Sequence, residues 1–224
     1  MKTKNGQVST AQILSLFGKG GVLMFGRRCN TLPAEAGQTD RDRQLSPIGC
    51  GQVVLIARKL VDRKFDLVLS SPAERARTTT AVITGRRDRD IGTVTTFGIS
   101  EDPSEPLNVM RTLLKYAPLS EYYKHELAEH LHEFGHVALA EILSLVAAVK
   151  ADGTARVFVG GHAVLHPQVM YTLGEFIRQG GYEVGRVLQS YAEGATMGEG
   201  EVVILTFSSV GNTLTGIGFE SIKP

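Results

Sequence analysis

Short apolar stretches alternate with longer helical patterns along most of this chain, and this alternation restricts its fold more than any other feature. Buried strands are indicated at 22–25 (VLMF), 65–71 (FDLVLSS), 93–99 (TVTTFGI) and 156–161 (RVFVGG). Strands that alternate with helices form βαβ units, whose mainly parallel sheet is covered on both faces. The sequence therefore predicts an α/β fold, a three-layer α/β/α sandwich.

The helical patterns have recognisable starts. Ser46-Pro47 and Ser71-Pro72 each place an N-cap serine before a proline at the first helical position. Further helices are predicted over 11–17, 106–117, 118–134, 136–151 and 166–179. The chain closes with a strand pair, 201–209 and 213–219, joined by a turn at 210–212.

Composition restricts the class of protein and its partners. With 224 residues, of which 42% are hydrophobic, the chain is long enough for one well-buried core, so we expect a single domain over 1–224. A net charge of +1 gives no reason to expect a nucleic-acid or membrane partner, and no apolar run is long enough to span a bilayer. Cys29 and Cys50 form no CxxC pair, which favours a reducing, cytoplasmic compartment.

In open α/β sheets, ligands bind beyond the carboxyl ends of the strands. The corresponding loops here are 25–30, 70–77, 99–102 and 160–166. They carry the anion binders, one acid and one imidazole, namely Arg27, Arg28, Arg75, Arg77, Glu101 and His162. Because guanidinium groups grip phosphoryl oxygens and an imidazole can donate to the same oxygens, these loops predict a phosphate site.

Two longer blocks resemble the histidine phosphatase superfamily, whose fold is phosphoglycerate mutase-like. FDLVLSSPAERARTTTA is similar to its block D-x-hydrophobic-x-S-S-P-x-x-R-A-x-x-T-A, and DRQLSPIGCGQVV to its block D-x-x-L-[ST]-x-x-G-x-x-Q-A. VFVGGH resembles the late strand that ends in the second catalytic His, and GISEDP is a weaker match to the L-x-E stretch. The resemblance covers roughly residues 20 to 220, with 1–20 as an N-terminal extension and 104–150 as a helical insert.

The resemblance implies roles for individual residues. Arg75 and His162 would bind the phosphoryl oxygens and Glu101 would be the general acid, with Arg27 or Arg28 replacing a lost arginine. The ligand would be phosphate or a small phosphorylated molecule, and no cofactor or metal is implied. These are expectations from the family.

The family's nucleophilic His lies in an Arg-His-Gly motif at the end of the first strand. Aligning VLM with that strand places Phe25 at the Arg, Gly26 at the His and Arg27 at the Gly, and the chain has no His before His125. Because a phosphohistidine intermediate needs an imidazole, we expect a pseudophosphatase that binds a phosphoester with little or no hydrolysis. The alternative is an active phosphatase or mutase with unorthodox chemistry, using water activated by Glu101 or His162, or Cys29 as the nucleophile.

A competing motif is HEFGH at 132–136, which satisfies the H-E-x-x-H pattern of zinc hydrolases. In that pattern His132 and His136 would bind zinc, with Glu129 or His125 as loose candidates for a third ligand. The extended form with a downstream Gly and His is absent, since Leu139 and Ile142 stand there. The sequence favours a polar, partly exposed helix over a metal site, and a zinc hydrolase is the second alternative.

Overall fold

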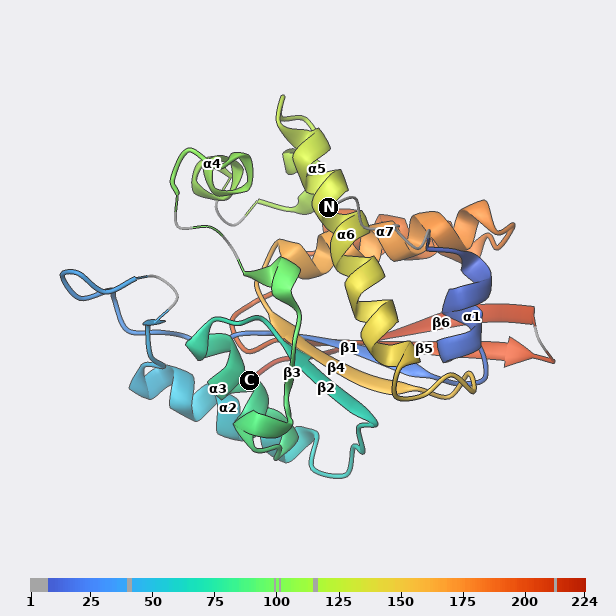
Figure 1. Ribbon diagram of the computed structural model, residues 1–224, viewed down its shortest axis with the longest axis horizontal. Coiled ribbons are helices and arrows are strands. Elements are labelled where there is room, and N and C mark those ends of the chain that lie inside the picture. The colour runs from blue at the N-terminus through green and yellow to red at the C-terminus, as the bar shows by residue number, and fades with distance from the viewer. Residues whose placement is uncertain (1–7, 40–41, 99, 101, 115–116, 212) are drawn as a thin grey trace.

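The structure, a computed structural model, describes residues 8–39, 42–98, 100, 102–114, 117–211 and 213–224. They form a six-stranded sheet with the order β3-β2-β4-β1-β5-β6 (Figure 1). The strands are β1 Val22–Arg27, β2 Leu67–Ser70, β3 Gly92–Thr93, β4 Arg156–Gly161, β5 Val202–Val210 and β6 Thr213–Ile222. The first four are parallel, whereas β5 is antiparallel to both β1 and β6. The predicted mainly parallel sheet and the closing strand pair are confirmed.

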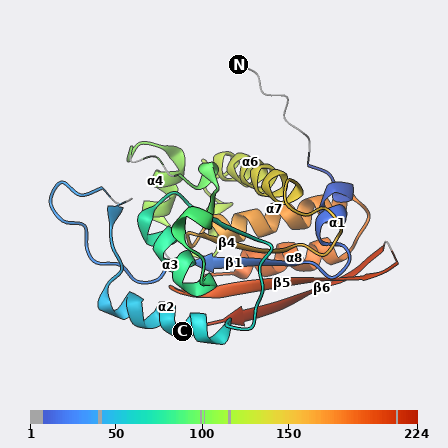
Figure 2. The same cartoon turned by 60° about the horizontal axis from the view of Figure 1, so that its bottom comes forward.

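Helices cover both faces of the sheet, and Figure 2 shows α6 and α7 on the side opposite to α2. One face packs against α1 Thr10–Phe17, α6 Ala128–Ala147, α7 Leu165–Gln179 and α8 Val184–Gly194. The other face packs against α2 Pro47–Lys59 and α3 Glu74–Thr84. The predicted three-layer α/β/α sandwich is therefore confirmed.

Side chains of the central strand alternate between two buried clusters. Leu23 and Phe25 of β1 lie in the cluster under α1, α6 and α7, whereas Met24 lies in the cluster under α2 and α3. In β4, Val157 and Phe158 are divided in the same way. This alternation is the two-residue period of a strand with both faces buried. This alternation determines which face of the sheet each side chain reaches where the strands end.

The two predicted serine-proline starts differ in the structure. Ser46 caps α2 as predicted, because its hydroxyl accepts a hydrogen bond from the Gly49 N–H at 3.0 Å. α3 begins later than predicted, at Glu74 with Ala73 as its N-cap. The Ser71 hydroxyl accepts only a long bond, 3.3 Å, from the Ala73 N–H, so it remains directed toward other partners.

Two strand predictions are corrected. β1 continues to Arg27, two residues beyond the predicted end at Phe25. The predicted strand at 93–99 pairs only through Thr93, and Thr95–Phe97 forms the 3₁₀ turn η3. The reason is Glu141 of α6, whose carboxylate accepts hydrogen bonds from the backbone and hydroxyl groups of both Thr95 and Thr96. These four bonds replace the ladder that a strand would make.

The helical insert is arranged differently from the three helices predicted for it. It holds α4 Pro106–Leu113, the single turn α5 Leu119–Tyr122 and then α6, which is continuous through Gly135. A side chain at Gly135 would overlap Thr172 and Gln168 of α7, so the glycine permits close helix packing rather than a break. α8 was not predicted. Within the described residues, no helix is both long and apolar enough to cross a membrane.

Candidate phosphate site

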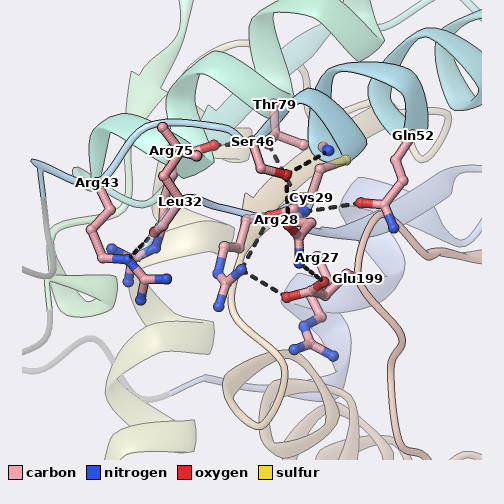
Figure 3. Close-up of polar contacts among 12 residues, drawn as sticks. Arg27, Arg28, Cys29, Leu32, Arg43, Ser46, Gln52, Arg75, Thr79 and Glu199 are labelled. Carbon is pink, nitrogen blue, oxygen red and sulfur yellow. Dashed lines mark hydrogen bonds and ion pairs between the residues drawn. The ribbon is translucent and has the colours of Figure 1, made fainter. Parts of the chain in front are cut away.

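The structure brings together the predicted residues at the ends of β1, β2 and β4. Arg27, Arg28, Arg75 and His162 all line one cavity of about 920 Å³. Figure 3 draws the side chains of Arg27, Arg28 and Arg75 together with the polar contacts around them. Glu101, the predicted general acid, lies outside the described residues. Of the described residues in the predicted cluster, four line this cavity, and Arg77 does not.

The end of β1 differs from the predicted register. Gly26 is still inside the strand, where it pairs with Gly160 of β4 and Val202 of β5. A side chain at Gly26 would overlap the ring of Phe158, which belongs to the core under α2 and α3. The position therefore faces the core and not the cavity. At this end of the strand, Arg27 and Arg28 line the cavity, whereas Cys29 is buried in the core under α2 and α3.

The two arginines at the end of β1 contact the segment that precedes β5. Arg27 is buried, and its Nη1 donates to the carbonyl of Met197. Arg28 Nη1 donates to the Glu199 carboxylate at 3.1 Å, forming an ion pair with side-chain exposures of 18% and 30% (Figure 3). Glu199 also accepts a 2.8 Å bond from the amide of Asn30. Both guanidinium groups are therefore fixed at the cavity wall.

Glu199 carries a full negative charge in this setting. Burial opposes ionisation of its carboxyl, but the hydrogen bond from Asn30 and the charges of Arg28 and Arg27 outweigh burial and lower its pKa. An ionised carboxylate thus neutralises part of the positive charge that Arg28 brings to the cavity.

Cys29 is a poor candidate for a nucleophile. Its side chain is fully buried, and burial raises the pKa of the thiol to about 11, although a hydrogen bond with Thr79 works in the opposite direction. The nucleophilic form of cysteine is the thiolate. At neutral pH this thiol remains protonated, so the structure disfavours the hypothesis that Cys29 replaces the missing histidine.

His162 follows β4 and is 5% exposed. Its Nε2 lies 3.0 Å from the hydroxyl of Ser71, which is also 3.2 Å from the Phe97 carbonyl. Burial is the largest influence on the imidazole, and the positive charges of Arg111 and Arg75 add to it, so the pKa of His162 lies well below its ordinary value. His162 is neutral at pH 7 and can hydrogen-bond a phosphoryl oxygen or accept a proton.

The two arginines of α3 have different surroundings. Arg75, in the first turn, is 3% exposed and lines the cavity. Arg77 points away, toward Asp88 at 2.7 Å and the hydroxyl of Thr93 at 3.0 Å. The contacts of Arg77 therefore connect α3 to η2, Asp88–Asp90, and they direct its side chain away from the predicted phosphate site.

Several cavity residues were not predicted. Arg43 comes from the polar loop after β1 and Arg111 from α4. Among the described residues that line the cavity, five are arginines, and one, Glu199, is acidic. Arg111 affects the pKa of His162 more than Arg75 does. An arginine in a polar loop or on a helix of unknown packing carries no local signal in the sequence, so neither Arg43 nor Arg111 was found there.

A second buried histidine lies behind the site. His166, in the first turn of α7, is completely buried between Phe25 and Phe97, with ring centroids 5.2 and 5.5 Å away. Neither ring nitrogen has a hydrogen-bond partner among the described residues. Burial, with a smaller effect of the Arg27 charge, lowers its pKa to about 3. His166 is therefore a neutral core residue that packs against Phe97, a residue of the cavity lining.

The HEFGH motif lies on α6, and its histidines have other contacts. The His132 ring stacks on Tyr123 with centroids 4.6 Å apart, and His136 is 3.6 Å from the Glu175 carboxylate. Across the described ranges, no group of three or more His, Cys, Asp or Glu side chains is placed to hold a metal ion. The described residues thus provide no third ligand beside His132 and His136.

This α/β/α fold, with a cavity at the carboxyl edge of its sheet, can be compared with known proteins. The family model for the histidine phosphatase superfamily (branch 1) matches residues 27–98. No curated protein matches the sequence. The match begins at Arg27, the last residue of β1.

Solved structures match over most of the chain. The structure of the open reading frame Rv3214 from Mycobacterium tuberculosis has 15% identity and a TM-score of 0.54, covering 88% of this chain and 97% of that one. Mycobacterial glucosyl-3-phosphoglycerate phosphatase Rv2419c in complex with VO3 has 16% identity and a TM-score of 0.55, covering 91% and 99%. Its complex with inorganic phosphate has 18% identity and a TM-score of 0.54, covering 89% and 95%. The family match and this fold confirm the resemblance to the histidine phosphatase superfamily.

Proposed function

We propose that this chain is a histidine phosphatase superfamily protein that binds phosphate or a phosphoester with little or no hydrolysis. The observation that carries the proposal is the end of β1. Because the strand ends at Arg27, we place the family's Arg-His-Gly motif at Arg27-Arg28-Cys29 instead of at Phe25-Gly26-Arg27, which puts Arg28 in place of the nucleophilic histidine. An arginine held by an ion pair is no phosphoryl acceptor, since its guanidinium stays protonated.

The charges of the cavity support binding. A phosphomonoester near neutral pH is mostly a dianion, and the lining holds five arginines against Glu199. Guanidinium groups bind phosphoryl oxygens bidentately, and the His162 imidazole lines the same cavity. The phosphate and vanadate complexes of Rv2419c are in keeping with an anion site in this fold. Arg27, Arg28, Arg75 and His162 are the proposed ligands, in a single cytoplasmic domain.

An active phosphatase remains the second candidate because of one contact. His162 is neutral, and its Nε2 is 3.0 Å from the Ser71 hydroxyl at the cavity wall. A neutral imidazole in this place can act as a general base toward water, as the unorthodox mechanism requires. Glu101, the other proposed acid or base, lies outside the described residues.

The test combines binding and turnover. Titration calorimetry with inorganic phosphate should show binding to the natural protein, and Arg75→Ala should weaken it roughly 10- to 100-fold, because a charge-assisted pair of hydrogen bonds is lost. Arg63→Ala is the matched control, since Arg63 pairs with Glu220 at the surface. Equal phosphate affinity in the two variants would contradict the assignment of the site.

Turnover separates the two candidates. The natural protein should release no phosphate from p-nitrophenyl phosphate above background. Release that disappears in His162→Ala would instead establish the active phosphatase and overturn the pseudophosphatase.

A further inference from the structure

A second cavity, of about 260 Å³, lies beside the phosphate site. It is bounded by α5, the beginning of α7 and the segment 195–198 that precedes β5. Seven of its lining residues have apolar side chains, namely Ala117, Leu119, Ala163, Val164, Pro167, Ala195 and Met197. The surface of this second cavity is thus suited to an apolar group.

The two cavities are neighbours. Arg27, Ala163 and Val164 line both of them. Arg27 donates to the carbonyl of Met197, which lines the second cavity, so its guanidinium stands where the two cavities meet. A phosphate bound at Arg27 can therefore carry a substituent directly into the apolar cavity.

The size of the second cavity limits what enters it. An apolar cavity of about 150 Å³ is known to hold benzene, so about 260 Å³ accommodates a single ring or a short branched chain. A sugar is disfavoured, because hydroxyl groups placed among alanine, leucine and methionine side chains would lose their hydrogen bonds to water without replacement.

We infer that the ligand is a phosphomonoester of an apolar, ring-sized alcohol, with its phosphate at Arg27, Arg28, Arg75 and His162 and its apolar group in the second cavity. The inference rests on the proposed phosphate site, and it adds the chemical class of the group that the phosphate carries. Selectivity among phosphoesters then comes from α5 and the segment 195–198, rather than from the strand ends.

The experiment compares inorganic phosphate, glycerol 1-phosphate and phenyl phosphate by titration calorimetry on the natural protein. Phenyl phosphate should bind at least about tenfold more tightly than glycerol 1-phosphate, because burial of the ring removes apolar surface from water. Ala195→Leu, which fills only the second cavity, should abolish most of this preference while phosphate itself still binds.

Ala147→Leu is the matched control, because Ala147 is exposed at the end of α6 and lines neither cavity. If Ala195→Leu does not fold, Ala117→Leu fills the same cavity from its other side. Phosphate binding without preference for phenyl phosphate, or a preference that survives both substitutions, would overturn this inference alone. Absence of phosphate binding would overturn the proposed function and the inference with it.

Discussion

The ends of β2 and β4 and the end of β1 meet at one cavity, but they contribute different chemistry. After β2 and β4 come Arg75 and His162, the residue types that the family resemblance implies at these positions. After β1 come Arg28 and Cys29, an ion-paired cation and a protonated thiol. Under the proposed function, the end of β1 supplies cations that bind the phosphate but no nucleophile, whereas the ends of β2 and β4 keep the residue types that the family resemblance implies.

The largest effect is expected from variants that restore the family's nucleophilic histidine at the end of β1. Arg28→His combined with Cys29→Gly should produce hydrolysis of p-nitrophenyl phosphate roughly a hundredfold above the natural protein, because an imidazole nucleophile then faces the bound phosphate. Adding His162→Ala should remove the gained activity. If Phe25→Arg with Gly26→His restores turnover instead, the motif belongs at residues 25–27.

The same comparison predicts that Gly26 tolerates no side chain. Gly26→His should lower the free energy of unfolding by about 2 to 3 kcal/mol in urea titrations, because the imidazole would be forced against Phe158. Gly51→His is the control, since a side chain at this exposed position of α2 meets nothing within 4 Å. Equal stability of the two variants would disprove the orientation of Gly26 toward the core.

A smaller effect, on phosphate affinity, is expected from the ion pair between Arg28 and Glu199. Glu199→Gln should strengthen inorganic phosphate binding roughly three- to tenfold, because Arg28 then no longer shares its charge with a carboxylate. Calorimetry near pH 7 is suitable, since the lowered pKa of Glu199 keeps it ionised there in the natural protein. Glu220→Gln, which removes a surface partner of Arg63, should leave the affinity unchanged. Weaker binding in Glu199→Gln would mean that the carboxylate supports the site.

The smallest expected effect is a pH dependence of folding stability that comes from the buried His166. His166 has a pKa of about 3 in the folded protein and about 6.5 when unfolded, so between these values the unfolded chain binds the extra proton. Stability should therefore fall as the pH drops below about 6.5, by about 1 kcal/mol per pH unit from this residue. In urea titrations at pH 7 and 5.5, His166→Phe should show a smaller loss than the natural protein. Parallel losses would contradict a neutral, buried His166.

Periodicity and local motifs were sufficient to predict the layers, the parallel sheet and the closing strand pair. They did not predict where some helices and strands begin or end, because those positions depend on side chains that are distant in the sequence. The 3₁₀ turn at Thr95–Phe97 depends on Glu141, and the continuity of α6 depends on a glycine packed against α7. Neither partner is visible in a window of neighbouring residues.

The positions of Arg27, Arg28, Arg75 and His162 at one cavity were predictable, because these residues lie at or shortly after the ends of strands. The end of β1 was placed two residues too early, because the apolar run stops at Phe25 while the ladder of hydrogen bonds continues through Gly26 to Arg27. Arg111 and Glu199 were not found, since their approach to the cavity depends on how α4 and the segment before β5 fold back.

The segment before β5 also has a consequence for biogenesis. Its residues hold Arg27, Arg28 and Asn30 across sequence separations of 170, 171 and 169 positions, and β1 itself lies between β4 and β5. A ribosome must therefore release the chain through Gly161 before β1 acquires β4 as a neighbour, and through Val210 before it acquires β5. Such non-local pairing slows folding and leaves a growing polypeptide exposed to aggregation. We expect the nascent protein to depend on chaperones until residue 210 has emerged, and its arginine-rich strand end to be the last part of the molecule to become ordered.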